Sequence, residues 1–220
     1  MEFVLWSKLA KMTLTDWLWA GGAALAAISL LVLLICQKKR ERPGGKMELR
    51  SLLYGAMCLA LAFVLSYIKL FSMPMGGSIT LASMLPIFLY AHRFGLRRGL
   101  LCGLAYGLLQ FIQKPEVYHP VQILLDYGLA FTALGLAGSV KNLQLGALIG
   151  GAGRLLCHVA AGAVFFAEYA TPGMNPWWYS FLYNGGYLGA DLLLCLILSF
   201  PAAVAMKRIW GMRMPQCKTV

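Results

Sequence analysis

Three sets of polar side chains at helical spacing interrupt an otherwise apolar sequence. In the first set, Gln122 and Asp126 of HPVQILLDYGLAF lie four residues apart and therefore share one face of a helix. A carboxylate at this position can pair with a cation or accept a hydrogen bond from an amine. The adjoining Tyr127 favours ligand binding over the alternative, in which Asp126 only pairs with Arg154 to hold two helices together.

The second set is a stripe in GRLLCHVAAGAVFF. Arg154, His158 and Gly162 follow one another at intervals of four residues, and Phe166 continues the stripe by one more turn. Glycine at such a position lets a neighbouring backbone or a ligand come close. The residues alone leave two interpretations open, a ligand-binding stripe and a packed helix whose histidine hydrogen-bonds a neighbour.

The third set is a polar face on the last apolar segment, formed by Ser180, Asn184, Tyr187 and Asp191. Polar groups at membrane depth are costly when they face lipid. The face must therefore contact protein or a cavity, and for Asp191 a purely structural role is an equal alternative.

The segment FFAEYATPGMNPWWYS, which precedes this face, is rich in aromatic residues. Tryptophan and tyrosine often mark the membrane interface, which is the favoured interpretation for Trp177 and Trp178. For Phe166 and Tyr179 we favour an aromatic cage around a cation. Together with the carboxylate, histidine and asparagine, these rings predict a pocket near the outer face for a small, aromatic, positively charged ligand.

Motifs of other functional classes are missing from the sequence. It contains no G-x-x-x-x-G-K-[ST], H-E-x-x-H or G-x-S-x-G, the signatures of nucleotide, zinc-protease and serine-hydrolase sites. None of the six cysteines forms a C-x-x-C pair. We therefore expect no enzyme, no metal site and no bound cofactor.

The composition places these residues in a membrane protein. Of the 220 residues, 60% are hydrophobic and only 12% are charged, about half the charged share of a soluble domain. Apolar segments over 48–70, 77–92, 96–113, 120–140, 144–167 and 178–206 predict six helices. The second segment is short and contains Pro86, which predicts a bent or re-entrant element.

An additional helix is expected near the N-terminus, where an apolar run extends from about Trp17 to Cys36. Its basic cluster follows the run, whereas in a cleavable signal the basic residues precede it. The predicted fold is therefore an all-α integral membrane protein with an extra transmembrane helix and basic linker over 1–46. A six-helix membrane domain over 47–210 and a short tail over 211–220 follow.

The 19 lysines and arginines are distributed unequally between the two sides of these helices. Fourteen fall on one side, four fall on the other, and Arg154 lies within a helix. Because cationic loops face the cytoplasm, we expect the C-terminus inside and the N-terminus outside. The net charge of +11 is thus a signal of topology, and lipid rather than nucleic acid is the expected surrounding.

Four stretches together carry a family resemblance: GGSITLASMLPIFLYAHRFGLRRGLLCGLAYGLLQFI, HPVQILLDYGLAF, LLCHVAAGAVFFAEYA and YSFLYNGGY. They resemble the thiamine-specific S components of energy-coupling-factor (ECF) vitamin transporters over about residues 48–207. The resemblance implies a six-helix subunit of the bacterial cytoplasmic membrane that binds thiamine from outside with high affinity. It also implies association with a transmembrane coupling subunit and two ATPase subunits, which use ATP to drive release inward.

Carried over residue by residue, the resemblance implies a thiamine site formed by Asp126, Tyr127, Arg154, His158, Gly162, Phe166, Tyr179 and Asn184. Further candidates beside it are Gln122, Glu168 and Trp178. Some family members have a tryptophan and a glutamate before the second helix, where this chain has Gly77 and Leu81. One carboxylate of the family site is then missing, and Glu168 or the loop backbone is expected to replace it.

The partners and the mode of transport are also implied only by the resemblance. Ala56 and Ala60 match an A-x-x-x-A that docks on the coupling subunit, although ordinary helix packing also explains small residues four apart. The alternatives are a self-sufficient secondary transporter of thiamine or a related organic cation, coupled to protons through Asp126, Glu168 or Asp191, a purely structural membrane subunit, and an S component for another vitamin.

Overall fold

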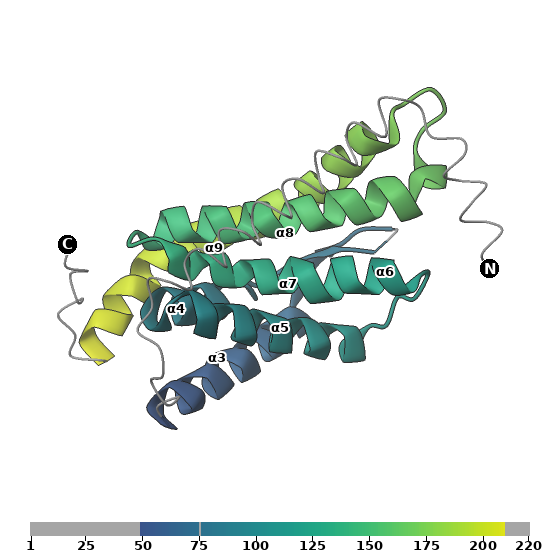
Figure 1. Cartoon of the computed structure of the whole chain (residues 1–220). Coiled ribbons are helices and arrows are strands. Elements are labelled where there is room, and N and C mark those ends of the chain that lie inside the picture. Colours follow the sequence, from purple (N-terminus) through teal and green to yellow (C-terminus); the bar gives the residue numbers. More distant parts are fainter. Residues whose placement is uncertain (1–48, 75, 210–220) are drawn as a thin grey trace. The chain divides into compact units, whose positions relative to one another are not determined.

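The computed structural model describes residues 49–74 and 76–209 of the chain (Figure 1). The chain divides into two units between Met47 and Glu48, and only the second unit contains described residues. The predicted additional helix over 1–46 and the predicted tail over 211–220 lie outside them. All described helices and strands therefore belong to the second unit.

The described part of the chain is mostly helical, as the composition predicts. In chain order its elements are α3 (Leu49–Tyr67), β1 (Lys69–Ser72), β2 (Ser78–Thr80), α4 (Leu85–Phe94), α5 (Leu96–Gln113), α6 (Pro120–Ile123), the π-helix η1 (Leu124–Leu129), α7 (Ala130–Ala133), the 3-10 helix η2 (Leu134–Ser139), α8 (Leu143–Phe165), the 3-10 turn η3 (Ala167–Tyr169) and α9 (Pro176–Ile209). The elements from α6 to η2 follow one another without a break.

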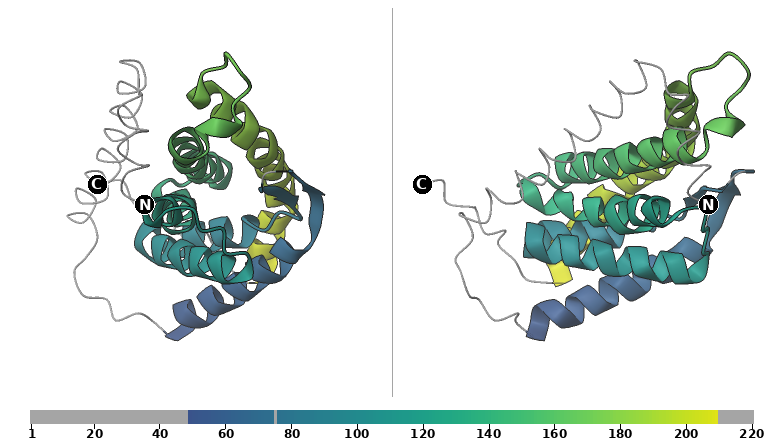
Figure 2. Two further views of the ribbon diagram at one scale, coloured as in Figure 1. Left: turned by 90° about the vertical axis from the view of Figure 1, so that its right-hand side faces the viewer. Right: turned by 45° about the vertical axis from the view of Figure 1, so that its right-hand side comes forward.

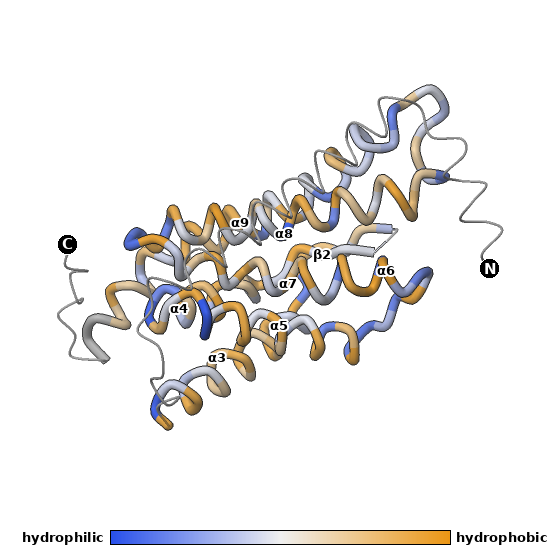
Figure 3. Tube along the Cα trace, in the orientation of Figure 1, coloured by the Kyte–Doolittle hydropathy of each residue, from blue (hydrophilic) through white to orange (hydrophobic). Residues whose placement is uncertain are grey.

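Four helical stretches of the described residues are long and apolar enough to cross a membrane: Leu49–Tyr67, Pro120–Ser139, Leu143–Phe165 and Pro176–Met206. The ten residues of α4 are too few to span a bilayer. The 18 residues of α5 are not among these four stretches, because two arginines and two glutamines lower their mean hydropathy. Figure 3 shows hydrophobic residues along most of the helices and hydrophilic residues concentrated toward their ends.

The segment 77–92, which the sequence predicts as a short helix that is bent or re-entrant, is helical only in its second half. Its first residues form β2, which pairs antiparallel with β1 in a two-stranded hairpin. The turn of this hairpin contains Gly76 at φ +85° and Gly77 at φ +80°, a backbone region in which only glycine is unstrained. The helix begins only at Leu85 because Pro86 occupies its first turn, where a missing N–H costs nothing.

Backbones approach closely where α5 packs on the composite helix that runs from α6 to η2. Gly99, Gly103 and Gly107 form a stripe along α5. A Cβ added at Gly103 would overlap the carbonyl oxygen of Phe131, and one at Gly107 would overlap that of Tyr127. Small residues at intervals of four permit this contact between membrane helices, so the stripe sets the position of the composite helix.

In the end-on view of the unit, the elements follow one another around a common axis (Figure 2, left). The sequence of neighbours in contact is α8, η1, α5, α3, β2 and α9, and α9 contacts α8 again. Large apolar side chains such as Met57, Leu108 and Phe200 are exposed on the outside of this ring, at 66%, 57% and 62%. An apolar exterior of this kind suits lipid, and it leaves the axis for polar groups.

Candidate functional site

A cavity of about 200 Å³ lies between the elements of this ring. Its walls come from α3, the β1–β2 hairpin, α5, the loop before α6, η1, α7, α8, the turn η3 and α9. The aromatic and ionisable residues among those lining it are Lys69, Tyr106, Lys114, Glu116, Asp126, Tyr127, Phe131, Arg154, His158, Phe166, Tyr169, Tyr179, Tyr183, Tyr187 and Asp191. The cavity therefore combines charged groups with many aromatic rings.

Asp126 and Tyr127 lie on a π-helical turn. The N–H of Ala130 bonds to the carbonyl oxygen of Leu125, five residues back, so one extra residue is accommodated within the turn. Single π-turns inside α-helices occur frequently at functional sites. Here the extra residue changes the angle between successive side chains, and both Asp126 and Tyr127 line the cavity.

A chain of hydrogen bonds links Asp126 to α8. One carboxylate oxygen accepts from the side-chain amide of Gln122 at 2.8 Å, and the other lies 2.8 Å from Nδ1 of His158. Arg154 donates through Nε to Nε2 of the same imidazole at 3.3 Å. Because arginine can only donate, Nε2 is the acceptor, and the proton of the neutral imidazole lies on Nδ1, facing Asp126.

The structural alternative required a direct pair between Arg154 and Asp126. The two side chains instead contact opposite nitrogens of the His158 ring, which lies between them. The guanidinium carbon of Arg154 is 4.2 Å from the centre of the Phe131 ring. A cation over an aromatic face is attracted by the ring quadrupole. Arg154 thus orients His158 while its own charge is held against an aromatic ring.

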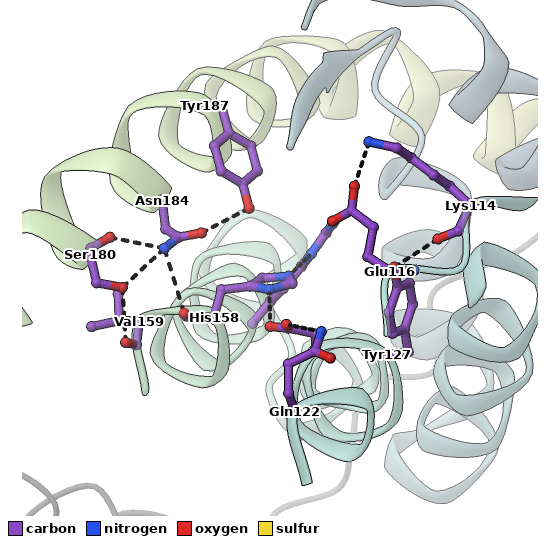
Figure 4. Close-up of polar contacts among 11 residues, drawn as sticks. Lys114, Glu116, Gln122, Tyr127, His158, Val159, Ser180, Asn184 and Tyr187 are labelled. Atoms are coloured by element: carbon purple, nitrogen blue, oxygen red, sulfur yellow. Dashed lines mark hydrogen bonds and ion pairs between the residues drawn. The ribbon is translucent and has the colours of Figure 1, made fainter. Parts of the chain in front are cut away.

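On the opposite wall, α9 presents Ser180, Asn184 and Tyr187 to the cavity (Figure 4). The hydroxyl of Ser180 donates to the carbonyl oxygen of Val159 at 2.9 Å. The amide of Asn184 donates to the hydroxyl of Ser180 at 3.2 Å, and the hydroxyl of Tyr187 donates to the amide oxygen of Asn184 at 2.9 Å. This polar face thus contacts protein and the cavity, as the cost of exposing it to lipid predicts.

Gly162 permits this arrangement of α8 and α9. A Cβ added at Gly162 would overlap the side-chain oxygen of Ser180 and lie 3.3 Å from the amide nitrogen of Asn184. The space that a side chain at position 162 would fill is therefore used by Ser180 of the neighbouring helix, and Gly162 also lines the cavity.

Aromatic rings contribute much of the cavity lining. Phe166 packs edge-on against Tyr118 with ring centres 4.8 Å apart, and Tyr179 stacks with Tyr183 at 6.0 Å. Trp178, in contrast, is 57% exposed and does not line the cavity. Its position suits the membrane-interface belt that the sequence suggests for it.

The hairpin is fastened to α9 at two points. The buried carboxylate of Asp191 accepts from the backbone N–H and the hydroxyl of Thr80, at 3.3 Å and 3.1 Å. The hydroxyl of Tyr183 donates to the carbonyl oxygen of Gly76 at 2.9 Å. Asp191 thus has a structural role in holding the hairpin against α9, and its side chain also lines the cavity.

All eight residues that the resemblance assigns to the site line this cavity: Asp126, Tyr127, Arg154, His158, Gly162, Phe166, Tyr179 and Asn184. Of the further candidates, Gln122 is buried behind Asp126, and neither Glu168 nor Trp178 lines the cavity. Gly77 lines it, whereas Leu81 does not.

Several residues that line the cavity were not identified from the sequence. The most important is Glu116, a carboxylate in the loop between α5 and α6. Tyr106, Gln110 and Gln113 on α5 also line the cavity. Their spacing of four and three residues at the end of an apolar segment is a helical signal that could have located the last three, whereas a loop carboxylate has no periodicity to reveal it.

The fold and the cavity together define an integral membrane protein with a polar, aromatic-lined site for a small molecule. The comparison with known proteins agrees with this class and narrows it. The chain belongs to the family described as thiamine transporter protein (Thia_YuaJ), whose model matches residues 52–210.

Two curated relatives and a solved structure support the membership. The chain is 37% identical over 163 residues to the thiamine transporter ThiT of Bacillus subtilis, a match that covers 65% of this chain and 84% of the relative. It is 30% identical over 136 residues to ThiT of Lacticaseibacillus paracasei, covering 52% and 68%. A structure of ThiT from Listeria monocytogenes superposes with a TM-score of 0.59 at 27% identity, covering 73% of this chain and 94% of that one. The resemblance drawn from the motifs is thereby confirmed.

Proposed function

We propose that this chain binds thiamine with high affinity and takes it up across the membrane as the substrate-specific subunit of an ATP-driven ECF transporter. Its membership of the thiamine transporter family supports the ligand. The observation that carries the proposal is the hydrogen-bonded cluster of Asp126, His158 and Arg154, which lies among aromatic rings in the cavity. This cluster provides the polar groups and the stacking surfaces that such a ligand needs.

Thiamine combines a neutral aminopyrimidine ring with a thiazolium ring that carries a fixed positive charge. Asp126 and Asn184 are proposed to engage the polar edges of the ligand, and His158, Phe166 and Tyr179 to surround its rings. Tyr127 contributes its ring only, since its hydroxyl is already used in bonds to the loop before α6. Arg154 and Gly162 act through their neighbours, by orienting His158 and by admitting Ser180.

The energetics of release favour a coupled ATPase over a self-sufficient transporter. Nanomolar binding corresponds to about 12 kcal/mol, whereas one cation moving inward gains about 2.3 kcal/mol per 100 mV. The membrane potential alone therefore cannot empty a tight site. Because the sequence contains no P-loop, the two ATPase subunits and the transmembrane coupling subunit are proposed as separate partners.

A docking face for the coupling subunit is proposed on α3. Ala56 and Ala60 are both exposed there, and they lie among the large apolar residues Met57 and Leu61, which are 66% and 53% exposed. Small residues allow another helix to come close. The A-x-x-x-A is thus available to a partner instead of being consumed in packing within the unit.

The proposed membrane orientation agrees with the position of the cavity. The distribution of cations predicts that the loops over 70–77, 113–120 and 168–177 lie outside. Gly76, Gly77, Lys114, Glu116 and Tyr169 belong to these loops, and all of them line the cavity. The chain is therefore proposed to lie in the bacterial cytoplasmic membrane as a multi-pass protein with its C-terminus inside. The site then opens toward the side from which the vitamin arrives.

Isothermal titration of the purified full-length chain with thiamine tests the ligand. We expect saturable binding with a sub-micromolar Kd and much weaker binding of riboflavin. Absence of saturable thiamine binding would overturn the proposal. Uptake into vesicles tests the mode of transport: accumulation should require the coupling and ATPase subunits with ATP, and accumulation by the chain alone that a proton ionophore abolishes would instead identify a proton-coupled secondary transporter.

A further inference from the structure

Glu116 adds a carboxylate to those of Asp126 and Asp191 in the cavity, from a segment that no motif marks. It lies in the loop between α5 and α6, and its side chain is 36% exposed, so it sits at the rim of the cavity that it lines. Figure 4 shows it on the side of His158 opposite to Asn184 and Tyr187. A ligand placed against His158 would thus meet Glu116 on one side and the polar face of α9 on the other.

The backbone of Glu116 is held in place by the residue next to Asp126. The hydroxyl of Tyr127 donates to the carbonyl oxygen of Lys114 at 2.8 Å and accepts from the N–H of Glu116 at 3.2 Å. The ring of Tyr127 packs edge-on against Phe111 at 5.1 Å. The loop carboxylate is therefore positioned by the same turn that positions Asp126.

The side chain of Glu116 reaches the turn of the hairpin. A Cβ added at Gly76 would lie 2.9 Å from Oε2 of Glu116, so the carboxylate rests against a residue without a side chain. The hydroxyl of Tyr183 holds the same glycine from α9. Glu116 thus contacts the hairpin turn, which α9 holds through Tyr183.

The partner of Glu116 in this structure is a lysine of its own loop. Nζ of Lys114 lies 2.5 Å from Oε1 of Glu116, and the lysine side chain is 60% exposed. An ion pair so open to solvent contributes little stability because water competes for both charges. A cationic ligand that enters the cavity and has lost its water shell can therefore replace Lys114 as the partner of Glu116.

The cavity is lined by equal numbers of carboxyl and cationic side chains. The carboxyl groups are those of Glu116, Asp126 and Asp191, and the cationic groups are those of Lys69, Lys114 and Arg154. Asp126 is occupied by Gln122 and His158, and Asp191 by Thr80. Among these three carboxyl groups, Glu116 is the one that pairs with a largely exposed lysine.

We propose that Glu116 binds the positively charged ring of the ligand, and that Lys114 occupies this carboxylate when the cavity is empty. The proposal rests on thiamine being the ligand and names the group that recognises its cationic ring. Asp126 then binds the uncharged aminopyrimidine ring. Glu116, and not Glu168, takes the place of the missing carboxylate.

The test compares thiamine with an analogue whose thiazolium is replaced by an uncharged ring of the same shape, by calorimetric titration of the full-length chain. In Glu116→Gln, the Kd for thiamine should rise about tenfold or more, as for a lost hydrogen bond or contact to a charged group. The Kd for the neutral analogue should change less than about threefold. Glu168→Gln, a carboxylate outside the cavity, should change neither.

Lys114→Gln provides an independent readout, because it removes the competing cation and leaves Glu116 intact. It should tighten thiamine binding and leave the neutral analogue unaffected. Equal weakening of both ligands in Glu116→Gln, or no tightening in Lys114→Gln, would overturn the assignment and leave Glu116 as a support of the hairpin. Those results would leave thiamine binding itself intact, whereas failure of the unmodified chain to bind thiamine would refute the proposed function.

Discussion

Replacing Asp126 by asparagine is the most informative single change, because it keeps the shape of the side chain and removes its charge. The carboxylate accepts from Gln122 and from His158, one on each oxygen and each at 2.8 Å. An asparagine amide has one acceptor oxygen, and its nitrogen can only donate. One of the two neighbouring donors must then face another donor.

Neither neighbour can adapt without breaking a further bond. His158 cannot move its proton to Nε2, because Arg154 donates to that nitrogen. Gln122 cannot turn its amide, because its oxygen accepts the N–H of Tyr118 at 3.3 Å. A buried donor left without an acceptor costs about 1–3 kcal/mol, so the variant should unfold in detergent at a lower temperature than the unmodified chain.

The effect on the ligand is expected to be larger than threefold. A hydrogen bond to a charged group contributes about 1.5–3 kcal/mol, and tenfold in Kd corresponds to about 1.4 kcal/mol. The Kd for thiamine in Asp126→Asn should therefore rise about 10- to 150-fold.

The assay is calorimetric titration in detergent at one fixed salt concentration, with thermal unfolding measured on the same samples. Glu168→Gln is the matched control, since it neutralises a carboxylate that does not line the cavity. A Kd within threefold of the unmodified chain, together with a lowered unfolding temperature, would refute the reasoning. That result would mean that Asp126 only holds η1 against α8.

Two glycine substitutions test the packing that positions the site. Gly107→Ala brings a Cβ onto the backbone oxygen of Tyr127, and overpacking of about 1–3 kcal/mol should lower the midpoint of thermal unfolding by roughly 3–10 °C. Gly189→Ala on α9, where the added Cβ meets no atom within 4 Å beyond the backbone of its own helix turn, is the control and should leave the midpoint unchanged or raise it. Gly162→Ala should displace Ser180 and weaken thiamine binding about tenfold or more in calorimetric titration, as expected when a bound geometry is lost; an unchanged Kd would show that the cavity tolerates the shift of α9.

The helices were predictable from the sequence because a spanning helix is a local property. An apolar run of about 20 residues matches the thickness of the bilayer whatever the rest of the chain does. The segment predicted over 48–70 is α3 (Leu49–Tyr67), and the one predicted over 144–167 is α8 (Leu143–Phe165). The same reasoning failed over 77–92, since Ser78–Thr80 pairs with Lys69–Ser72. Strand pairing depends on a partner elsewhere in the chain, and hydropathy does not report it.

The π-turn and the glycine contacts show the same limit at the site. The spacing of Gln122 and Asp126 predicts a shared helix face, and the bond between their side chains confirms it. The extra residue in η1 could not be predicted, because a π-turn is locally unfavourable and persists only where surrounding contacts support it. Those contacts include Gly107, whose missing side chain admits the backbone of Tyr127.

The sequence by itself determined the membrane class and the family, and it predicted eight binding residues, all of which line the cavity. Each of these inferences depends on composition or on motifs that are short and contiguous. Only the tertiary structure decided how these residues meet. It places His158 between Asp126 and Arg154, fastens the hairpin to α9 through Thr80, and brings Glu116 to the rim of the cavity. These contacts join segments far apart in the chain, and they exist only because helix packing brings them within the few ångströms over which hydrogen bonds and ion pairs act.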